Sequence, residues 1–274
     1  MEGRIQTEEL ELDDELAYSP TLKELNIPHG CSTWLFGDMR GHSDIDVFYR
    51  QTGLDRNNRI HIDSQLGSHV IMDDDRTGES LPQAEYPECD AVVTWVRGRT
   101  LSCLVADAFP VVLISEEQDR LALMTVGRQN VHSIIRSTVR RLQQSRIRFS
   151  LDSLTAYIGP GIHPESYRDF RLVWHLWFKF PEWRKHLYRL FSPKPKIDLL
   201  GYLIEELLMI GISESLIVET REDTVTATYS HGRTPLFFSE RAGRSGRFIF
   251  AVALPDDSSD NRAEKLAVDA VPVQ

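Results

Sequence analysis

Residues 101–115, LSCLVADAFPVVLIS, contain two apolar runs separated by the polar corner Ala106-Asp107-Ala108-Phe109-Pro110. Short apolar runs bounded by turn-forming residues are typical of buried β-strands. A corner between two such strands commonly carries a reactive side chain, because loops held by a rigid sheet are where binding and catalytic groups gather. At the centre of this corner stands Ala108, which has no reactive atom. The stretch therefore predicts two buried strands and a site-like corner whose central residue has no functional side chain.

Two further apolar runs flank this stretch, AVVTWV at 91–96 and RLALMTV at 120–126. Together with LSCLVA and PVVLIS they predict neighbouring strands. Their nearly continuous apolar character indicates burial on both faces, so helices or a second sheet must cover them.

Three helices are predicted further along the chain. The first follows Asn130, which can cap it, and its apolar face at helical spacing consists of Val131, Ile134, Ile135, Thr138, Val139 and Leu142. The second covers 165–180 and ends before Pro181. Core packing explains its aromatic face better than a platform for stacking nucleic-acid bases does, and that face consists of Tyr167, Phe170, Val173, Trp174, Trp177 and Phe178. The third runs from Asp198 to Gly211.

Short strands are predicted at SLIVET (215–220), TVTATYS (224–230) and FIFAVAL (248–254). Strands and helices follow one another without a regular βαβ order. This pattern favours a mixed α/β (α+β) fold with central mixed β-sheets covered by helices.

The composition of the 274 residues is that of a folded globular protein, with 41% hydrophobic residues and a net charge of −10 from 31 Lys+Arg and 41 Asp+Glu. This charge argues against a nucleic-acid or membrane partner bound through bulk electrostatics. The three cysteines form no C-x-x-C pair, the acidic N-terminus has no apolar region typical of a secretory signal, and no apolar stretch is long enough for a membrane span. We therefore expect a soluble protein in a reducing, cytoplasmic compartment.

The ends of the chain differ in composition from its middle. Residues 1–28 are acidic and predict a peripheral N-terminal extension, and residues 255–274 predict a polar tail that is mobile at least in part. Residues 29–254 remain as a single domain.

One short motif resembles the signature of a known class of enzymes. Ser43-Asp44-Ile45-Asp46-Val47 resembles the nucleotidyltransferase signature, in which two carboxylates at alternate positions of a strand share one face and hold Mg²⁺. In that family a Gly-Ser pair precedes the carboxylates, whereas here Gly37 is followed by Asp38. This alternative requires Asp44 and Asp46 to converge.

A second resemblance covers residues 30 to 254 and explains more of the chain. Several segments, in order, resemble the laccase-domain family, also called multicopper polyphenol oxidase-like proteins, whose members are described as purine nucleoside phosphorylases with adenosine deaminase activity. The resembling segments are Gly30-Cys31-Ser32, Leu35-Phe36-Gly37-Asp38-Met39-Arg40-Gly41, Gln65-Leu66-Gly67, Cys89 to Thr94, Ala106 to Val111, Met124 to Asn130, Ile158 to Ile162, Ile197-Asp198-Leu199, Phe237 to Arg241 and Ser245-Gly246-Arg247. The resemblance implies the mixed fold already predicted.

The resemblance also implies a Zn²⁺ site made of a His, a Cys and a second His, which leaves a fourth position open. The matching positions here are Leu66, Ala108 and Thr125. Leu and Ala have no donor atom, and a neutral Thr hydroxyl is a poor zinc ligand. Possible substitutes are His69, Cys103 and His132, but the first two lie at odd offsets along their strands and the third lies inside a predicted helix. We therefore predict a degenerate site without bound zinc or another cofactor.

The resemblance leaves a set of residues that could form a residual pocket, namely Asp107, Gly127, Arg128, Gln129, Gly159, Arg241 and Arg244. For Asp107 a turn-forming role is an alternative, and Arg241 and Arg244 belong to a Gly-rich loop that could either grip an anion or be a solvated turn. The favoured hypothesis is a pseudoenzyme retained for binding a purine nucleoside-like ligand or a protein partner, such as an active relative or another copy of itself. The alternative is an active purine-nucleoside enzyme with a rewired or metal-free site.

Overall fold

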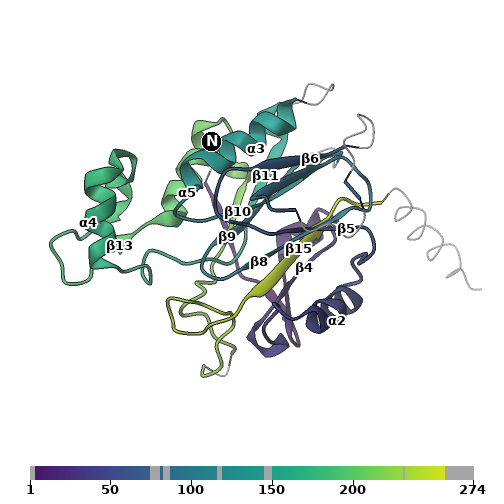
Figure 1. Cartoon of the computed structure of the whole chain (residues 1–274), viewed down its shortest axis with the longest axis horizontal. Coiled ribbons are helices and arrows are strands. Elements are labelled where there is room, and N and C mark those ends of the chain that lie inside the picture. The colour runs from purple at the N-terminus through teal and green to yellow at the C-terminus, as the bar shows by residue number, and fades with distance from the viewer. Residues whose placement is uncertain are drawn as a thin grey trace, which may run out of the picture.

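The polar corner at residues 106–108 is the point at which the chain passes from one β-sheet to another (Figure 1). Strand β8 (Thr100–Val105) precedes the corner and belongs to a six-stranded sheet, whereas β9 (Phe109–Ser115) follows it and belongs to a seven-stranded sheet. The computed structural model describes residues 4–74, 81–82, 87–115, 119–144, 150–230 and 232–256. The four apolar runs were predicted to be neighbouring strands. This is wrong for β8, which lies in a different sheet from the strands formed by the other three runs.

The seven-stranded sheet mixes parallel and antiparallel pairs. Its strands, in spatial order, are β1 (Gln6–Glu8), β14 (Ile217–Thr220), β11 (Leu154–Ile158), β9, β10 (Leu121–Val126), β7 (Ala91–Thr94) and β6 (Val70–Asp73). The six-stranded sheet is antiparallel except for its last pair. Its strands are β2 (Glu11–Asp13), β3 (Leu16–Tyr18), β4 (His29–Ser32), β15 (Phe248–Ala253), β8 and β5 (Arg59–Ile62).

Alternation along the strands assigns side chains to two cores. Ala122 and Met124 of β10 pack toward the helices, while Leu121 and Leu123 pack toward the second sheet. The core between the sheets also receives Cys103 from β8. Both faces of β9 and β10 are buried, as their continuous apolar sequence predicts, and the cover is helices on one face and a sheet on the other.

The helices complete a layered arrangement around the two sheets (Figure 1). Helices α3 (Val131–Gln143) and α5 (Leu199–Met209) cover the seven-stranded sheet, and α2 (His42–Thr52) covers the outer face of the six-stranded sheet. The remaining elements are α1 (Pro20–Glu24), α4 (Phe170–Lys179), the 3₁₀ turns η1 (Trp34–Phe36), η2 (Leu151–Ser153), η3 (Pro181–His186) and η4 (Glu214–Leu216), and the short pair β12 (Leu187–Tyr188) and β13 (Lys196–Ile197). The mixed fold class predicted from the sequence is confirmed.

Helix α3 follows its predicted pattern at every position. The six residues expected on its apolar face are the buried ones. Asn130 occupies the N-cap position, but its side chain does not cap the helix: its Oδ1 accepts from Gly127 N–H at 2.8 Å and its amide donates to the Thr125 carbonyl at 2.9 Å. Asn130 therefore fixes the turn between β10 and α3 rather than the first turn of the helix.

Two predictions about helices and strands are corrected. The aromatic face of the 165–180 segment is core only in part: Tyr167 and Val173 are buried and Trp177 packs against the core, whereas Phe170 and Phe178 are exposed. TVTATYS at 224–230 forms turns, with a single isolated bridge at Thr228, rather than a strand.

The acidic N-terminal segment is also corrected, because it belongs to the fold rather than lying outside it. Strand β1 pairs with β14 at the edge of one sheet, and β3 pairs with β4 in the other. Leu16 and Leu22 are buried. The polar tail predicted from residue 255 lies outside the described residues from 257 onward. Within the described ranges, no helix is long and apolar enough to cross a membrane.

Candidate functional site

A cleft of about 190 Å³ lies around the corner between the two sheets. Five chain segments that are distant in sequence meet there: the loop after β5, the corner itself, the turn between β10 and α3, the two ends of the segment that contains α4, and the loop before β15 that carries Arg241. The residues that line the cleft are Leu66, Ala106, Asp107, Ala108, Gly127, Arg128, Gln129, Ile162, Tyr167, Leu199 and Arg241. The structure thus brings together two of the three positions assigned to zinc ligands and five of the seven residues predicted for a residual pocket.

Asp107 has a left-handed backbone conformation, with φ of 68°. Its carboxylate accepts hydrogen bonds from Thr224 Oγ1 at 2.9 Å, Ser239 Oγ at 2.6 Å and the Arg241 N–H at 3.0 Å. Its carbonyl accepts from the Ile162 N–H at 3.0 Å. Asp107 therefore ties the corner to the 223–241 region, and these donors occupy much of its capacity to accept hydrogen bonds.

The loop that carries Leu66 is held by a buried carboxylate. Asp90 is 2% exposed and accepts from Ser64 Oγ, Gln65 N–H and His69 N–H. Leu66 has a φ of 55°, a conformation that costs an L-residue about 1–2 kcal/mol. A Cβ added at Gly127 would lie 3.0 Å from both methyl groups of Leu66. Leu66 is therefore pressed against the glycine of the opposite turn and narrows the cleft.

Thr125, the third position assigned to a zinc ligand, does not line the cleft. It is 2% exposed, and its side chain lies against the Cys103 thiol between the two sheets. Burial raises the pKa of Cys103 to about 12, against a smaller opposing effect of Thr125. Cys103 is therefore a neutral thiol at ordinary pH and a poor nucleophile or metal ligand.

Two arginines give the cleft its cationic character. Arg241 pairs with Asp169 at 3.0 Å, and its guanidinium lies 4.9 Å from the centre of the Tyr167 ring. Burial raises the pKa of Tyr167, while Arg241 and Arg128 beside it act in the opposite direction. Arg128 forms no ion pair with any residue that the structure describes. The cleft therefore presents one neutralised guanidinium and one without a carboxylate partner.

Two residues predicted for the residual pocket serve the fold instead. The Arg244 guanidinium donates to the carbonyl oxygens of Phe237, Thr224 and Val225. A Cβ at Gly159 would lie 2.8 Å from Pro110 Cγ, so a glycine is needed where these segments approach. Neither residue lines the cleft.

Sequence and structural comparisons identify the relatives of this fold. The sequence model of the family described as multi-copper polyphenol oxidoreductase laccase matches residues 42–255. The chain belongs to this family. The hypothetical protein YfiH from Bacillus licheniformis superimposes with a TM-score of 0.70 at 17% identity, over 89% of this chain and 98% of that one. YlmD from Geobacillus stearothermophilus gives 0.69 at 18% identity, over 90% and 99%. No match is found among curated proteins.

A third relative in structure is the Neisseria meningitidis protein NMB0706, with a TM-score of 0.63 at 17% identity over 89% of this chain and 96% of that one. Identities this low establish the laccase-domain fold alone. What this chain can do must therefore be argued from the residues in its own cleft.

The side chains of the cleft do not fit the metal that the family implies. Leu66 and Ala108 supply no donor atom, and Thr125 is turned away from the cleft. Among the described residues, no group of three or more His, Cys, Asp or Glu side chains could hold a metal ion. We therefore derive no catalytic step through a metal for this laccase-domain protein.

The possible substitute ligands also lie elsewhere. His69 is exposed and its Nδ1 lies 2.8 Å from the Glu88 carbonyl. His132 is exposed on α3, and Cys103 is fully buried between the sheets. None of the three lines the cleft.

The nucleotidyltransferase hypothesis is wrong, because Asp44 and Asp46 lie on helix α2 and not on a strand. Two residues that are two positions apart on a helix point in divergent directions. Asp46 pairs with Arg56 at 2.9 Å, while the Asp44 carboxylate lies beside Gly41 at the start of the helix. The two carboxylates do not converge on a cation.

Sequence reasoning missed four cleft residues, Ala106, Ile162, Tyr167 and Leu199, as parts of the site. Ile162 and Leu199 lie in segments that resemble the family, which was a usable signal. Tyr167 was assigned to a helix face, but it precedes the first residue of α4 and its ring lies under Arg241. Nothing in the local sequence distinguishes it from the other aromatic residues of that segment.

Proposed function

We propose that this protein is a non-catalytic member of the family that binds a small anionic molecule in the cleft. The observation that carries the proposal is the exposure of the Arg128 guanidinium to the cleft without a carboxylate partner among the described residues. A guanidinium recognises phosphate and carboxylate groups through paired hydrogen bonds.

The other walls of the cleft support a compact ligand. Leu66, Ala108 and Ile162 offer apolar contact in the same cleft. Helix α5 begins at Leu199 in the cleft wall, and α3 begins just beyond Gln129, so the positive ends of two helix dipoles lie at its rim. A volume of about 190 Å³ is below the roughly 300–1,000 Å³ of clefts that enclose drug-sized ligands. Inorganic phosphate, or the phosphate end of a sugar or nucleoside, fits this size.

The loss of family-type catalysis rests on donor chemistry. The three positions assigned to zinc ligands carry two hydrocarbon side chains and one neutral hydroxyl. An active enzyme with a rewired or metal-free site remains the alternative function, and it would need a nucleophile or base in the cleft. Asp107 is the carboxylate there, and its oxygens already accept three hydrogen bonds.

We further propose a reducing compartment such as the cytoplasm. Cys31, Cys89 and Cys103 are free and buried. Burial raises the pKa of Cys89 and of Cys103 to about 12, so these thiols are kept unreactive by the fold.

Isothermal titration with inorganic phosphate, adenosine and inosine tests the binding function. Arg128→Ala is the test variant, and Arg140→Ala, an exposed arginine on α3 outside the cleft, is the matched control. We expect phosphate to bind the native protein and the control, and Arg128→Ala to bind at least about tenfold more weakly. Phosphate binding that is unchanged by Arg128→Ala, or no binding by the native protein, would contradict the proposal.

A further inference from the structure

The segment that contains α4 and β13 projects from one end of the molecule, apart from the two sheets (Figure 1), and it carries exposed aromatic side chains. We call residues 163–198 the arm. Phe170 is 54% exposed, Phe178 72% and Phe191 93%. The Trp174 ring contacts all three, with centroid distances of 6.3, 5.9 and 6.1 Å. These four rings form a continuous cluster, which is named the aromatic cluster below.

The aromatic cluster is distinct from the face by which α4 packs on the protein. Val173 and Leu176 are buried against the rest of the arm, where Trp183 packs on Tyr202 of α5. Phe170, Trp174 and Phe178 recur every four residues and form a second stripe on the helix. A large apolar side chain left in water forgoes the free energy that its burial would contribute. A contiguous apolar surface of this kind is typical of an interface.

The charges around the aromatic cluster are basic, although the chain as a whole is acidic. Arg171, Lys179, Arg189 and Lys194 are exposed, and none of them forms an ion pair within the described part of the chain. Phe191 lies in the turn between β12 and β13, between Arg189 and Lys194. The partner of the arm must therefore combine apolar surface with negative charge.

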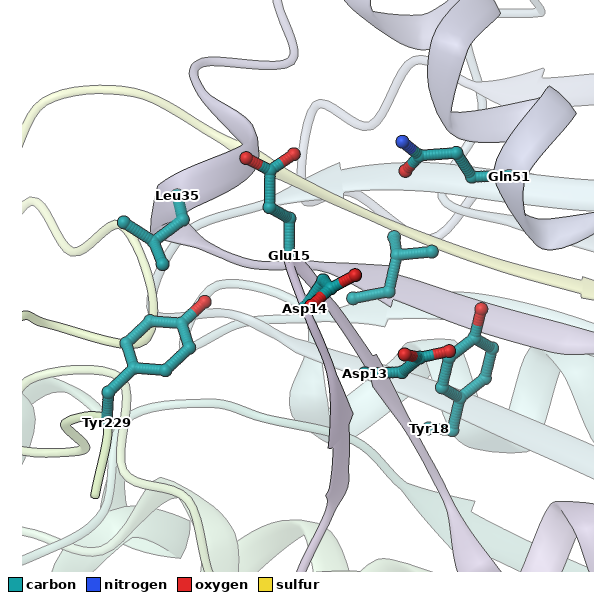
Figure 2. Close-up of a pocket in the computed structure, with 8 residues that line it drawn as sticks. Asp13, Asp14, Glu15, Tyr18, Leu35, Gln51 and Tyr229 are labelled. Atoms are coloured by element: carbon teal, nitrogen blue, oxygen red, sulfur yellow. The ribbon is translucent and has the colours of Figure 1, made fainter.

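The same chain carries a surface with those properties. A groove of about 680 Å³ lies beside the turn between β2 and β3, and Figure 2 shows Asp13, Asp14 and Glu15 at it with Leu35 and Tyr229. The three acidic residues are exposed and form no ion pair with any described residue. Leu35 is 49% exposed. Burial, and then the charge of Asp13, raises the pKa of Tyr18 in the same groove.

We propose that the arm of one copy docks in the acidic groove of a second copy. The Phe191 ring enters the groove against Leu35 and Tyr229, and Arg189 and Lys194 lie beside the Asp13 to Glu15 turn. The volume of the groove accommodates an aromatic side chain, and opposite charges bring the two surfaces together. Arm and groove are different surfaces, so the contact is heterologous. It closes a dimer when two copies exchange arms and otherwise continues as a ring or chain.

This inference does not rest on the cleft or its ligand, and sedimentation velocity tests it separately. The native protein is compared at several micromolar concentrations in about 50 mM and about 500 mM NaCl. We expect self-association that strengthens with concentration and weakens with salt. Phe191→Ser should weaken it at least about tenfold, because a central aromatic residue dominates such contacts. Because the Phe191 side chain is almost fully exposed, we expect its replacement to leave the stability of the fold unchanged.

Charge reversal identifies the two surfaces. An arm variant (Arg189→Glu with Lys194→Glu) and a groove variant (Asp13→Lys with Glu15→Lys) should each be monomeric, and an equimolar mixture should form a mixed dimer because the reversed charges again attract. Arg140→Glu, an exposed change away from both surfaces, should associate as the native protein does.

Three outcomes would overturn the proposal. They are a native protein that stays monomeric throughout, association that the arm variants leave unchanged, and reversed variants that fail to pair. Vesicles containing phosphatidylserine are included as a probe. If they bind a monomeric native protein, and Phe191→Ser abolishes that binding, the occupant of the arm is a membrane surface and not a second copy.

Discussion

At the scale of single residues, the corner between the sheets keeps a demanding local structure although its central side chain is alanine. Asp107 holds a left-handed backbone conformation and receives three hydrogen bonds from residues more than 100 positions away in the sequence. Leu66, which also lines the cleft, likewise has a positive φ angle. Such conformations persist only where the surrounding structure enforces them. The corner is therefore a structural joint as well as a wall of the cleft.

Replacing the carboxylate at the corner should destabilise the whole protein. Hydrogen bonds to a charged group contribute about 1.5–3 kcal/mol each, and part of this is recovered by water at a half-exposed site. We expect Asp107→Ala to lower the free energy of unfolding by about 2–4 kcal/mol in urea denaturation. Gln129→Ala, an exposed change in the same cleft, is the control and should stay within about 0.5 kcal/mol. A loss below about 1 kcal/mol for Asp107→Ala would contradict the structural role.

His29 predicts a dependence of stability on pH. Its Nε2 accepts from the Ser19 N–H and its Nδ1 donates to the Ile27 carbonyl, both at 2.8 Å, so the neutral ring fits the site. Burial lowers the pKa of His29 from 6.5 to about 4. Because the unfolded chain takes up the proton first, stability is retained above pH 6.5 and is lost as the pH falls from 6.5 to about 4.

The expected loss at pH 5 is on the order of 2 kcal/mol relative to pH 7, measured as the free energy of unfolding. His29→Gln removes this titration and keeps an acceptor for the Ser19 N–H, so its stability should fall less over the same range. An identical fall in the variant and the native protein would show that other groups cause the acid sensitivity.

At the scale of elements, periodicity in the sequence predicted helix α3 well, because six apolar residues at helical spacing have one interpretation. The nucleotidyltransferase alternative required Asp44 and Asp46 to lie on a strand, and residues 42–52 form a helix instead. Ile45, Phe48 and Tyr49 recur at helical spacing and are buried against the six-stranded sheet, which explains why this segment is a helix. Periodicity failed for β8, since an apolar run does not reveal which of two sheets it joins. The aromatic stripe of α4 was taken for core because apolar character alone cannot distinguish a core face from an interface.

The N-terminal strands supply a prediction at this scale. Strands β1 to β3 cover an edge of each sheet, and removing them would expose unpaired backbone groups of β14 and β4. A chain that lacks residues 1–18 should therefore unfold at lower temperature and aggregate. A chain that lacks residues 1–4 removes nothing from β1 and is the control. Equal melting temperatures for the two deletions, followed by circular dichroism, would refute the assignment of these strands to the core fold.

At the scale of the whole molecule, two sheets and their covering helices hold segments that are distant in sequence around one cleft. The resemblance in sequence located most of that cleft, because its segments are short motifs with fixed order. It could not locate Tyr167, nor reveal that Arg244 and Gly159 serve the backbone, since those roles depend on how loops pack. The fold is that of the family, whereas the cleft is lined by cationic and apolar side chains and one hydrogen-bonded carboxylate, and by no His or Cys among the described residues.

Metal analysis of the purified protein, combined with an assay of adenosine and inosine turnover, tests most directly whether this chain has kept the fold without the metal chemistry. The protein is purified without chelator, supplied with Zn²⁺, dialysed and measured by inductively coupled plasma mass spectrometry. We predict substoichiometric zinc and no turnover with or without phosphate. Zinc bound at about one equivalent, together with turnover that a chelator abolishes, would contradict the proposal.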